Sequence, residues 1–175
     1  GPDGPSYPGE TLGGMAPEAL AEHYGFDRLS RDGRWLEVND PTLRVLEGLY
    51  ADRSVESIRQ AADHIRAAAA TRLPARAADQ FKGLVLSYAE YSEQLDALDE
   101  KRNRLGLKPG DVDVAGSLHS LQDRVFGQGD AAQLFGKRRE ARELMEKQRD
   151  RYAGREKRLT EQEIQQMREQ YQAIE

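Results

Sequence analysis

The sequence predicts an all-α protein, in which an N-terminal three-helix mini-domain leads through one long helix into an extended helical arm. Three observations support this prediction. An apolar seam with the spacing of a coiled coil runs through residues 74–105. Charged residues make up 33% of the chain and hydrophobic residues 38%, a balance that suits long polar-coated helices better than one deep core. Helix start and stop signals recur along the chain.

The seam defines the central helix of the predicted mini-domain. Its large side chains recur at steps of three and four residues, and they are Phe81, Leu84, Tyr88, Tyr91, Leu95 and Leu98. Leu73-Pro74 marks the start, because proline disfavours helix in the residue before it, and Gly106 marks the end. At about 1.5 Å per residue the helix is roughly 45 Å long, which predicts an elongated protein.

Two shorter helices precede the central one. Asp40-Pro41 offers a capping oxygen followed by proline, so the first is expected over 41–50. Ser54 caps the second, in which apolar residues recur at steps of three and four until Leu73-Pro74 ends it. Residues 32–38 offer at most a minor hairpin around an Asp-Gly turn.

The chain is expected to divide into four parts. Residues 1–25 are read as a flexible leader in which 16–25 offer a short helical turn, 26–105 as the helical mini-domain, 106–116 as a linker and 117–175 as the extended helical arm. Glycine and proline dominate the start of the leader, and turn residues fill the linker. The arm contains ten basic and five acidic residues between Lys137 and Arg158.

Three helices are expected in the arm. The first begins at Ser117 and ends at Gly127, the second runs from residue 131 to a stop signal at Gly154, and the third starts from a capping box at Thr160. The apolar stripe of the second helix is thin. A helix with so little to bury rests on a partner or projects into solvent.

No enzymatic signature emerges from the sequence. The three histidines share no metal-binding spacing, the chain has no cysteine, and neither a phosphate-binding loop nor a serine-hydrolase motif occurs. The net charge of −5 argues against nucleic-acid binding. We therefore expect a protein that is not an enzyme and uses no cofactor or metal.

The sequence offers no membrane-spanning run of about 18 apolar residues and no signal peptide. It begins Gly1-Pro2 without methionine, as after protease cleavage, so we expect a native N-terminal anchor or signal to have been removed. The absence of cysteine fits a cytosolic protein and equally an exported one that avoids oxidation.

Residues 28–99 and 117–136 contain a series of short motifs whose order and spacing resemble one known family. The motifs are Asp32-Gly33, Pro41-Thr42-Leu43-Arg44, Ser54-Val55-Glu56-Ser57-Ile58-Arg59, Leu73-Pro74, Tyr88 with Tyr91, Phe126-Gly127 and Leu134-Phe135-Gly136. In this respect the chain is similar to the periplasmic lipase chaperones, the lipase-specific foldases. Those proteins are membrane-tethered helical scaffolds that curl around a secreted lipase.

The resemblance implies a periplasmic steric chaperone, anchored in the inner membrane, that wraps a secreted hydrolase and assists its folding or its type II secretion. It implies one client per chaperone and membrane contact only through an N-terminal anchor outside this sequence. The partner-binding residues that it indicates are Arg44, Leu49, Tyr50, Phe126, Leu134 and Phe135.

The chain departs from the family in its lipase-activation motif. Arg44 matches the first position, but Glu47-Gly48-Leu49 stands where the family has Phe-Asp-Tyr. The client is therefore left open between a lipase and another secreted hydrolase, such as a protease. The alternative function is a helical adaptor or coiled-coil scaffold without foldase activity, in which the central helix pairs with itself through the seam from Phe81 to Leu98.

Overall fold

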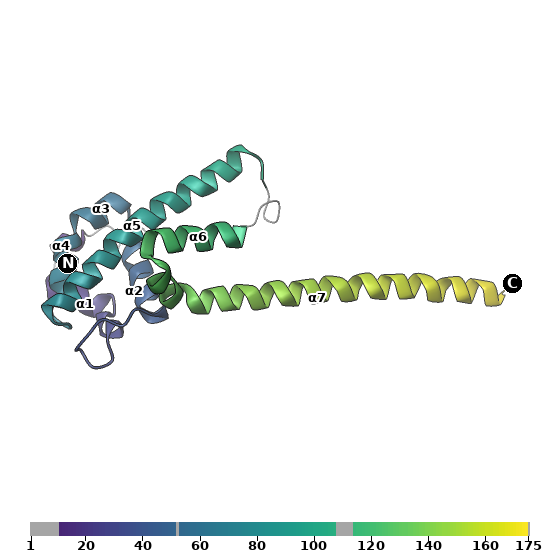
Figure 1. The fold of residues 1–175 in the computed structure, drawn as a ribbon, viewed down its shortest axis with the longest axis horizontal. Coiled ribbons are helices and arrows are strands. Elements are labelled where there is room, and N and C mark those ends of the chain that lie inside the picture. Colours follow the sequence, from purple (N-terminus) through teal and green to yellow (C-terminus); the bar gives the residue numbers. More distant parts are fainter. Residues whose placement is uncertain (1–10, 52, 108–113, 175) are drawn as a thin grey trace, which may run out of the picture. The chain divides into compact units, whose positions relative to one another are not determined.

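The structure, a computed structural model, describes residues 11–51, 53–107 and 114–174 (Figure 1). No strand occurs in these ranges, so the prediction of an all-α fold is confirmed. The helices are η1 (Leu12–Gly14), α1 (Pro17–His23), η2 (Phe26–Leu29), α2 (Asp40–Tyr50), α3 (Val55–Gln60), α4 (Ala62–Ala69), α5 (Ala75–Arg104), α6 (Val114–Phe126) and α7 (Gln128–Ile174). The chain forms two compact units, of which the first ends at Phe135 and the second begins at Gly136.

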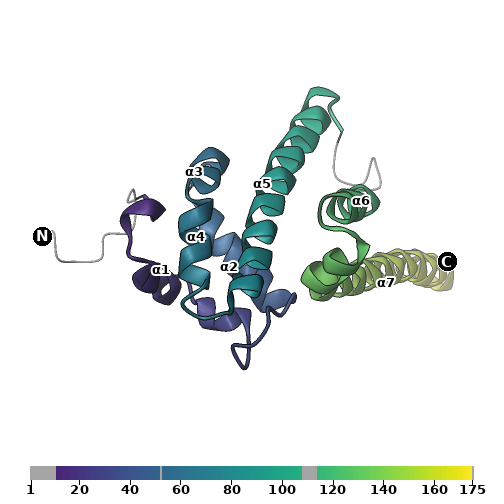
Figure 2. The ribbon, with the colours of Figure 1, turned by 60° about the vertical axis from the view of Figure 1, so that its left-hand side comes forward.

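The central helix of the first unit is α5. Helices α3 and α4 pack against it on one side of the unit, α1 packs on α4, and α6 lies along the C-terminal half of α5 (Figures 1 and 2). From the predicted seam, Phe81, Leu84 and Tyr91 are buried, while Tyr88 and Leu95 are partly buried against the same core. The seam is therefore confirmed from Phe81 to Leu95, whereas its last member, Leu98, is partly buried outside the core. More helices cover the seam than were predicted from the sequence.

Side-chain caps start two helices of the mini-domain. The Asn39 side chain accepts a hydrogen bond from the Thr42 amide at 3.1 Å, so the cap of α2 is Asn39 and not the neighbouring Asp40. Ser54 caps α3 as predicted, because its hydroxyl accepts from the Ser57 amide at 3.1 Å. The single helix expected after Ser54 is interrupted at Ala61, which lies outside the helical conformation between α3 and α4.

Two glycines with positive φ end the long helices of the first unit. Gly106, at φ 67°, closes α5, and the Leu107 amide reaches back to the Arg102 carbonyl at 3.0 Å. Gly127, at φ 84°, is the single residue between α6 and α7. Its amide donates to the Asp123 carbonyl of α6, and its carbonyl accepts from the Ala131 amide in the first turn of α7. Both stops were predicted from the sequence.

The predicted flexible leader is wrong for the residues that form η1 and α1, although α1 confirms the short helical turn expected at 16–25. Leu12, Leu20 and Ala21 are buried in the core of the first unit, while residues 1–10 lie outside the described part of the chain. This packing could not be predicted from the sequence because the segment is short and its first half is rich in glycine. Its apolar side chains are buried only when α4 supplies the other surface.

Arg72 ties this N-terminal segment to the turn between α4 and α5. Its guanidinium donates to Glu18 at 2.6 Å and to Asp27 at 2.7 Å, and it lies 3.5 Å from Glu22. The hydrogen bond with Glu18 is the main cause that raises the pKa of Arg72. The guanidinium is the less exposed partner in all three pairs, so one cation holds three surface carboxylates in place.

Residues 30–39 form an irregular loop rather than the minor hairpin considered above. The Ser30 hydroxyl donates to Asp32, the Asp32 carboxylate accepts from the Arg34 amide, and the Glu37 amide donates to the Leu29 carbonyl at 2.9 Å. The Trp35 side chain lies on this loop and is 59% exposed.

Helix α7 is continuous, so the predicted stop at Gly154 and restart at Thr160 are both wrong. One glycine in a helix interior costs about 1 kcal/mol relative to alanine. The high helix propensity of the surrounding Arg, Glu, Gln and Lys residues offsets this cost, so the helix continues. The capping sequence at Thr160 is therefore absorbed into the helix.

The boundary between the two units also differs from the predicted domain division. Helix α6 and the first turns of α7 belong to the first unit, whereas the sequence analysis placed 117–175 together as an arm after a linker at 106–116. Of that linker, residues 108–113 lie outside the described part of the chain. The difference arises because α6 packs on α5, where Phe126 contacts Tyr91 of the seam.

Candidate protein-binding surfaces

Five aromatic side chains form a cluster where α2, α5, α6 and α7 meet. They are Tyr50, Tyr88, Tyr91, Phe126 and Phe135. Tyr91 is the centre, with ring centroids 5.7 Å from Phe126 and 5.5 Å from Phe135. Its hydroxyl also receives a hydrogen bond from Gln122 of α6 at 3.3 Å. Tilted and edge-to-face pairs at these separations are the favourable arrangements of aromatic rings.

This cluster overturns part of the predicted partner-binding set. Phe126 and Phe135 are buried in the cluster, Leu134 is buried beside it, and Leu49 is buried on the inner face of α2. These four side chains hold the first unit together and offer no surface to a partner in this structure. The sequence signal that could have revealed this is the length of the seam, since Tyr88, Tyr91 and Leu95 also need a covering surface.

Tyr50 connects α2 to α5 through its hydroxyl, which donates to the Val85 carbonyl at 2.6 Å. Burial is the main cause that raises the pKa of Tyr50, and the nearby Arg59 acts in the opposite direction. The hydroxyl therefore stays protonated and keeps its donor role at neutral pH. Tyr50 is partly buried, which leaves little of it available to a partner.

Tyr50→Phe is expected to lower the free energy of unfolding by about 1 kcal/mol, because it removes one intramolecular hydrogen bond. Since the pKa is higher in the folded state, the stability due to the neutral hydroxyl is complete below the unfolded-state pKa of 10.0 and is lost above it. The difference in the free energy of unfolding between wild type and Tyr50→Phe should therefore be smaller at a pH above 10 than at pH 8. Urea unfolding at the two pH values measures this, with Tyr152→Phe on exposed α7 as control. A pH-independent difference contradicts it.

Arg44 is the predicted partner-binding residue that remains exposed. Its guanidinium pairs with Asp40 one turn earlier on α2 at 2.8 Å, and 64% of the Arg44 side chain is exposed. The Asp40 side chain is only 10% exposed, so Arg44 compensates the charge of a buried carboxylate while its own guanidinium faces solvent.

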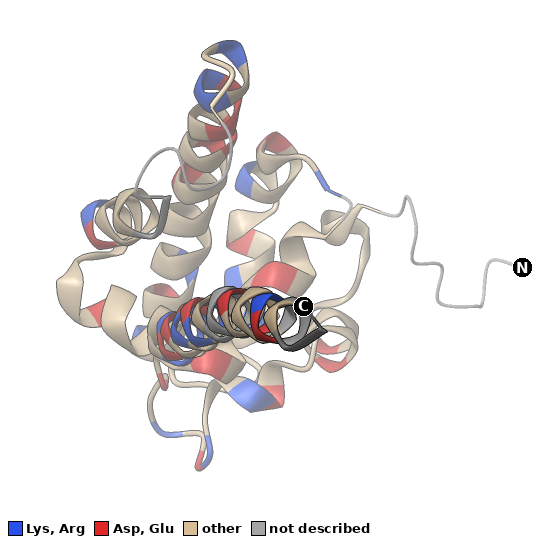
Figure 3. Cartoon of the chain, turned by 90° about the vertical axis from the view of Figure 1, so that its right-hand side faces the viewer, with Lys and Arg blue, Asp and Glu red and all other residues tan. Residues whose placement is uncertain are grey.

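The second unit carries exposed apolar side chains on a strongly charged helix. From residue 140 to residue 153 every side chain of α7 is exposed. Leu144, Met145 and Tyr152 belong to this segment and are 57%, 60% and 65% exposed. Basic and acidic residues alternate around them, as the colours along α7 show (Figure 3). Met145 and Tyr152 are separated by two turns and lie on the same face of the helix.

The described residues contain no group of three or more potential metal-binding side chains. In the same part of the chain, no helix has the length and apolar content needed to cross a bilayer. His64 is used structurally, because its Nε2 donates to the Met15 carbonyl and so fastens the segment after η1 to α4.

The fold and these surfaces define an all-α protein with a well-packed first unit and an exposed, mixed-charge helix in its second unit. Comparison with known proteins adds no relative: no family model, no curated protein and no solved structure matches the chain.

Proposed function

We propose that this protein is a steric chaperone of the periplasm, tethered to the inner membrane, which assists the folding or secretion of a secreted hydrolase that it binds 1:1. The proposal draws its cellular setting and client class from the ordered motifs in 28–99 and 117–136 that resemble the lipase-specific foldases. Such a helper needs no bond chemistry. It stabilises whichever client conformation it contacts best, and so favours the near-native state.

The observation that carries the proposal is the exposed apolar set Leu144, Met145 and Tyr152 on α7. Fully burying each such side chain contributes on the order of 1.5–3 kcal/mol, which is a strong incentive to bind another surface. The surrounding charges keep the free helix soluble and restrict which surfaces it accepts. A long polar helix with a few large apolar contacts suits a client that must later be released.

The client is either a lipase or another secreted hydrolase such as a protease. Arg44 is retained and exposed, but the residues that follow it in the activation motif of the foldases are replaced. Leu49, which occupies one of these replaced positions, is buried. The contacts that α2 makes with its client are therefore expected to differ from those of the lipase chaperones.

The decisive experiment is co-expression of this chain with the exported hydrolase whose gene lies beside its own. A stable 1:1 complex in size-exclusion chromatography with light scattering, together with higher yield of active hydrolase, is expected. Met145→Ser combined with Tyr152→Ser should weaken the complex, whereas Leu86→Ser, at an exposed apolar position of α5, should not. A hydrolase that folds and is secreted normally without this chain would refute the proposal.

The alternative is a helical adaptor or scaffold without foldase activity. Self-pairing through the α5 seam, the form considered from the sequence, is less favoured because the chain's own helices cover Phe81, Leu84 and Tyr91. The same exposed side chains of α7 that favour a client also favour pairing between copies. Light scattering of the isolated protein separates the two functions, since pairing gives a mass that rises with concentration.

A further inference from the structure

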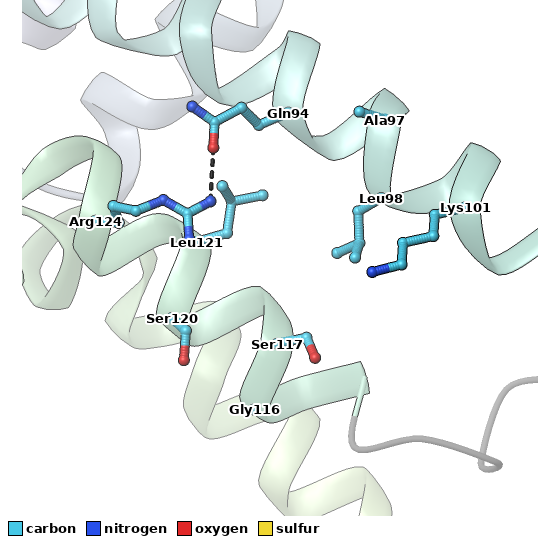
Figure 4. Close-up of a pocket in the computed structure, with 9 residues that line it drawn as sticks. All are labelled: Gln94, Ala97, Leu98, Lys101, Gly116, Ser117, Ser120, Leu121 and Arg124. Atoms are coloured by element: carbon cyan, nitrogen blue, oxygen red, sulfur yellow. Dashed lines mark hydrogen bonds between the residues drawn. The ribbon is translucent and has the colours of Figure 1, made fainter.

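A groove lies between the C-terminal half of α5 and the facing side of α6 (Figure 4). Its volume is about 690 Å³. Each helix lines it with residues at positions i, i+3, i+4 and i+7, starting from Gln94 on α5 and from Ser117 on α6. This spacing places all four residues of a stripe on one helix face, so the groove follows the two helices for about 10 Å.

The two stripes contain cations but no carboxylate. Lys101 lies at one end of the groove and Arg124 at the other, because α5 and α6 run in opposite directions (Figure 4). Arg124 donates to the neutral side chain of Gln94 at 2.6 Å. The neighbouring acidic residue Asp99 instead pairs with Arg102, away from the stripe. The residues that line the groove thus carry positive charge only, although neighbouring positions of the two helices are acidic, among them Asp96, Glu100 and Asp123.

The floor between the cations is apolar. Leu98 and Leu121 point toward each other across the groove, and Leu121 is almost fully buried beneath it (Figure 4). The wall formed by α6 is built from small residues, including Ser117 and Ser120. Small side chains allow a third backbone to approach closely, and packed helices have axes only about 8–10 Å apart.

We propose that this groove binds an acidic amphipathic helix of a partner protein over about two turns. Leucine-like side chains of the bound helix contact Leu98 and Leu121, and its carboxylates meet Lys101 and Arg124 at the two ends. A helix fits better than an extended strand because the walls are two helices with matched stripes and present no row of unpaired backbone groups. The inference deepens the proposed function, on which it rests for the identity of the partner as the client.

The test uses a fluorescein-labelled 16-residue peptide held helical by a side-chain staple, with leucine at positions 5, 8 and 12 and glutamate at the flanking positions. A matched peptide replaces every glutamate with lysine. In fluorescence anisotropy at low salt, the acidic peptide is expected to bind about tenfold more tightly than the basic one, as two surface-exposed ion pairs allow. The preference should decrease as salt is added. Equal binding of both peptides would overturn the proposal.

Charge reversal then locates the site. The double variant Lys101→Glu with Arg124→Glu is expected to lose the preference for the acidic peptide and to favour the basic one. Both positions are exposed, so the fold should persist, which far-UV circular dichroism and thermal melting verify. Arg104→Glu, an exposed change on α5 outside the stripe, serves as the matched control and should retain the wild-type preference. Unchanged peptide preference in the folded double variant would show that the groove is not the site.

Two further outcomes separate this inference from the proposed function. In the first, the protein binds the acidic peptide through Lys101 and Arg124 and yet forms no complex with the hydrolase. That result refutes the proposed chaperone function and leaves the groove supported as a helix-binding site. A hydrolase complex that the double variant still forms with unchanged affinity preserves the chaperone and refutes the groove as its contact. Light scattering of the wild type and of the double variant tests a further occupant. If the wild type self-associates and the double variant does not, a second copy occupies the groove and the partner-helix proposal is wrong.

Discussion

Phe81→Ala is expected to lower the free energy of unfolding by about 3–5 kcal/mol, the usual cost of truncating a fully buried phenylalanine. The Phe81 side chain is completely buried on α5 and meets Phe26 of η2 edge to face, with ring centroids 5.3 Å apart. The variant leaves a cavity where the N-terminal segment reaches the central helix. Since small domains are stable by only 5–15 kcal/mol, a large fraction of the stability is lost.

Urea unfolding followed by far-UV circular dichroism measures this loss. Tyr152→Ala is the matched control, since it truncates an aromatic side chain that is exposed on α7 and should change stability by no more than about 0.5 kcal/mol. Phe81→Leu should be intermediate, because most of the buried volume is retained. A Phe81→Ala variant as stable as the control would show that the N-terminal segment does not pack on α5 as described.

Phe135→Ala is expected to loosen α6 and the first turns of α7 from α5, again at a cost of about 3–5 kcal/mol. Phe135 is buried and contacts both Tyr91 and Phe126, with centroids 5.5 Å and 5.6 Å away. Its loss removes two aromatic pairs together with the buried area. The packing of α1 and α4 involves neither partner, so the effect should be local.

Hydrogen exchange of the folded protein reveals such a local effect. Amides of α6 and of α7 up to residue 135 should exchange on the order of 10²–10³ times faster in Phe135→Ala, because each tenfold change corresponds to about 1.4 kcal/mol. Amides in α4 should keep most of their protection. Leu144→Ala, which truncates an exposed side chain of the same helix, is the control. Uniform loss of protection across the first unit would contradict a separable contact.

The sequence was most informative where local chemistry decides the structure. The cap at Ser54, the stops at Gly106 and Gly127 and the buried residues of the α5 seam follow from hydrogen-bonding capacity, positive φ and helical spacing. These features depend on a few adjacent residues. They can therefore be predicted without knowing what packs against them.

The sequence was least informative where one segment needs another to be stable. Leu20 is buried only because α4 lies across it, and the break at Ala61 has no glycine or proline to announce it. Phe126 and Phe135 were interpreted as partner contacts from the resemblance to the lipase chaperones. The structure buries them on Tyr91, 35 or more residues away in the chain, a distance over which spacing rules carry no information.

The exposed Trp35 has a practical consequence. It is the sole indole of the chain, and it already meets solvent on the loop of residues 30–39. Its emission should therefore change little when the core melts, and it is a poor reporter of denaturation. The same exposure makes Trp35 an intrinsic fluorescent probe of binding, so no dye is needed. Any macromolecule that covers this loop should shift the emission to shorter wavelength.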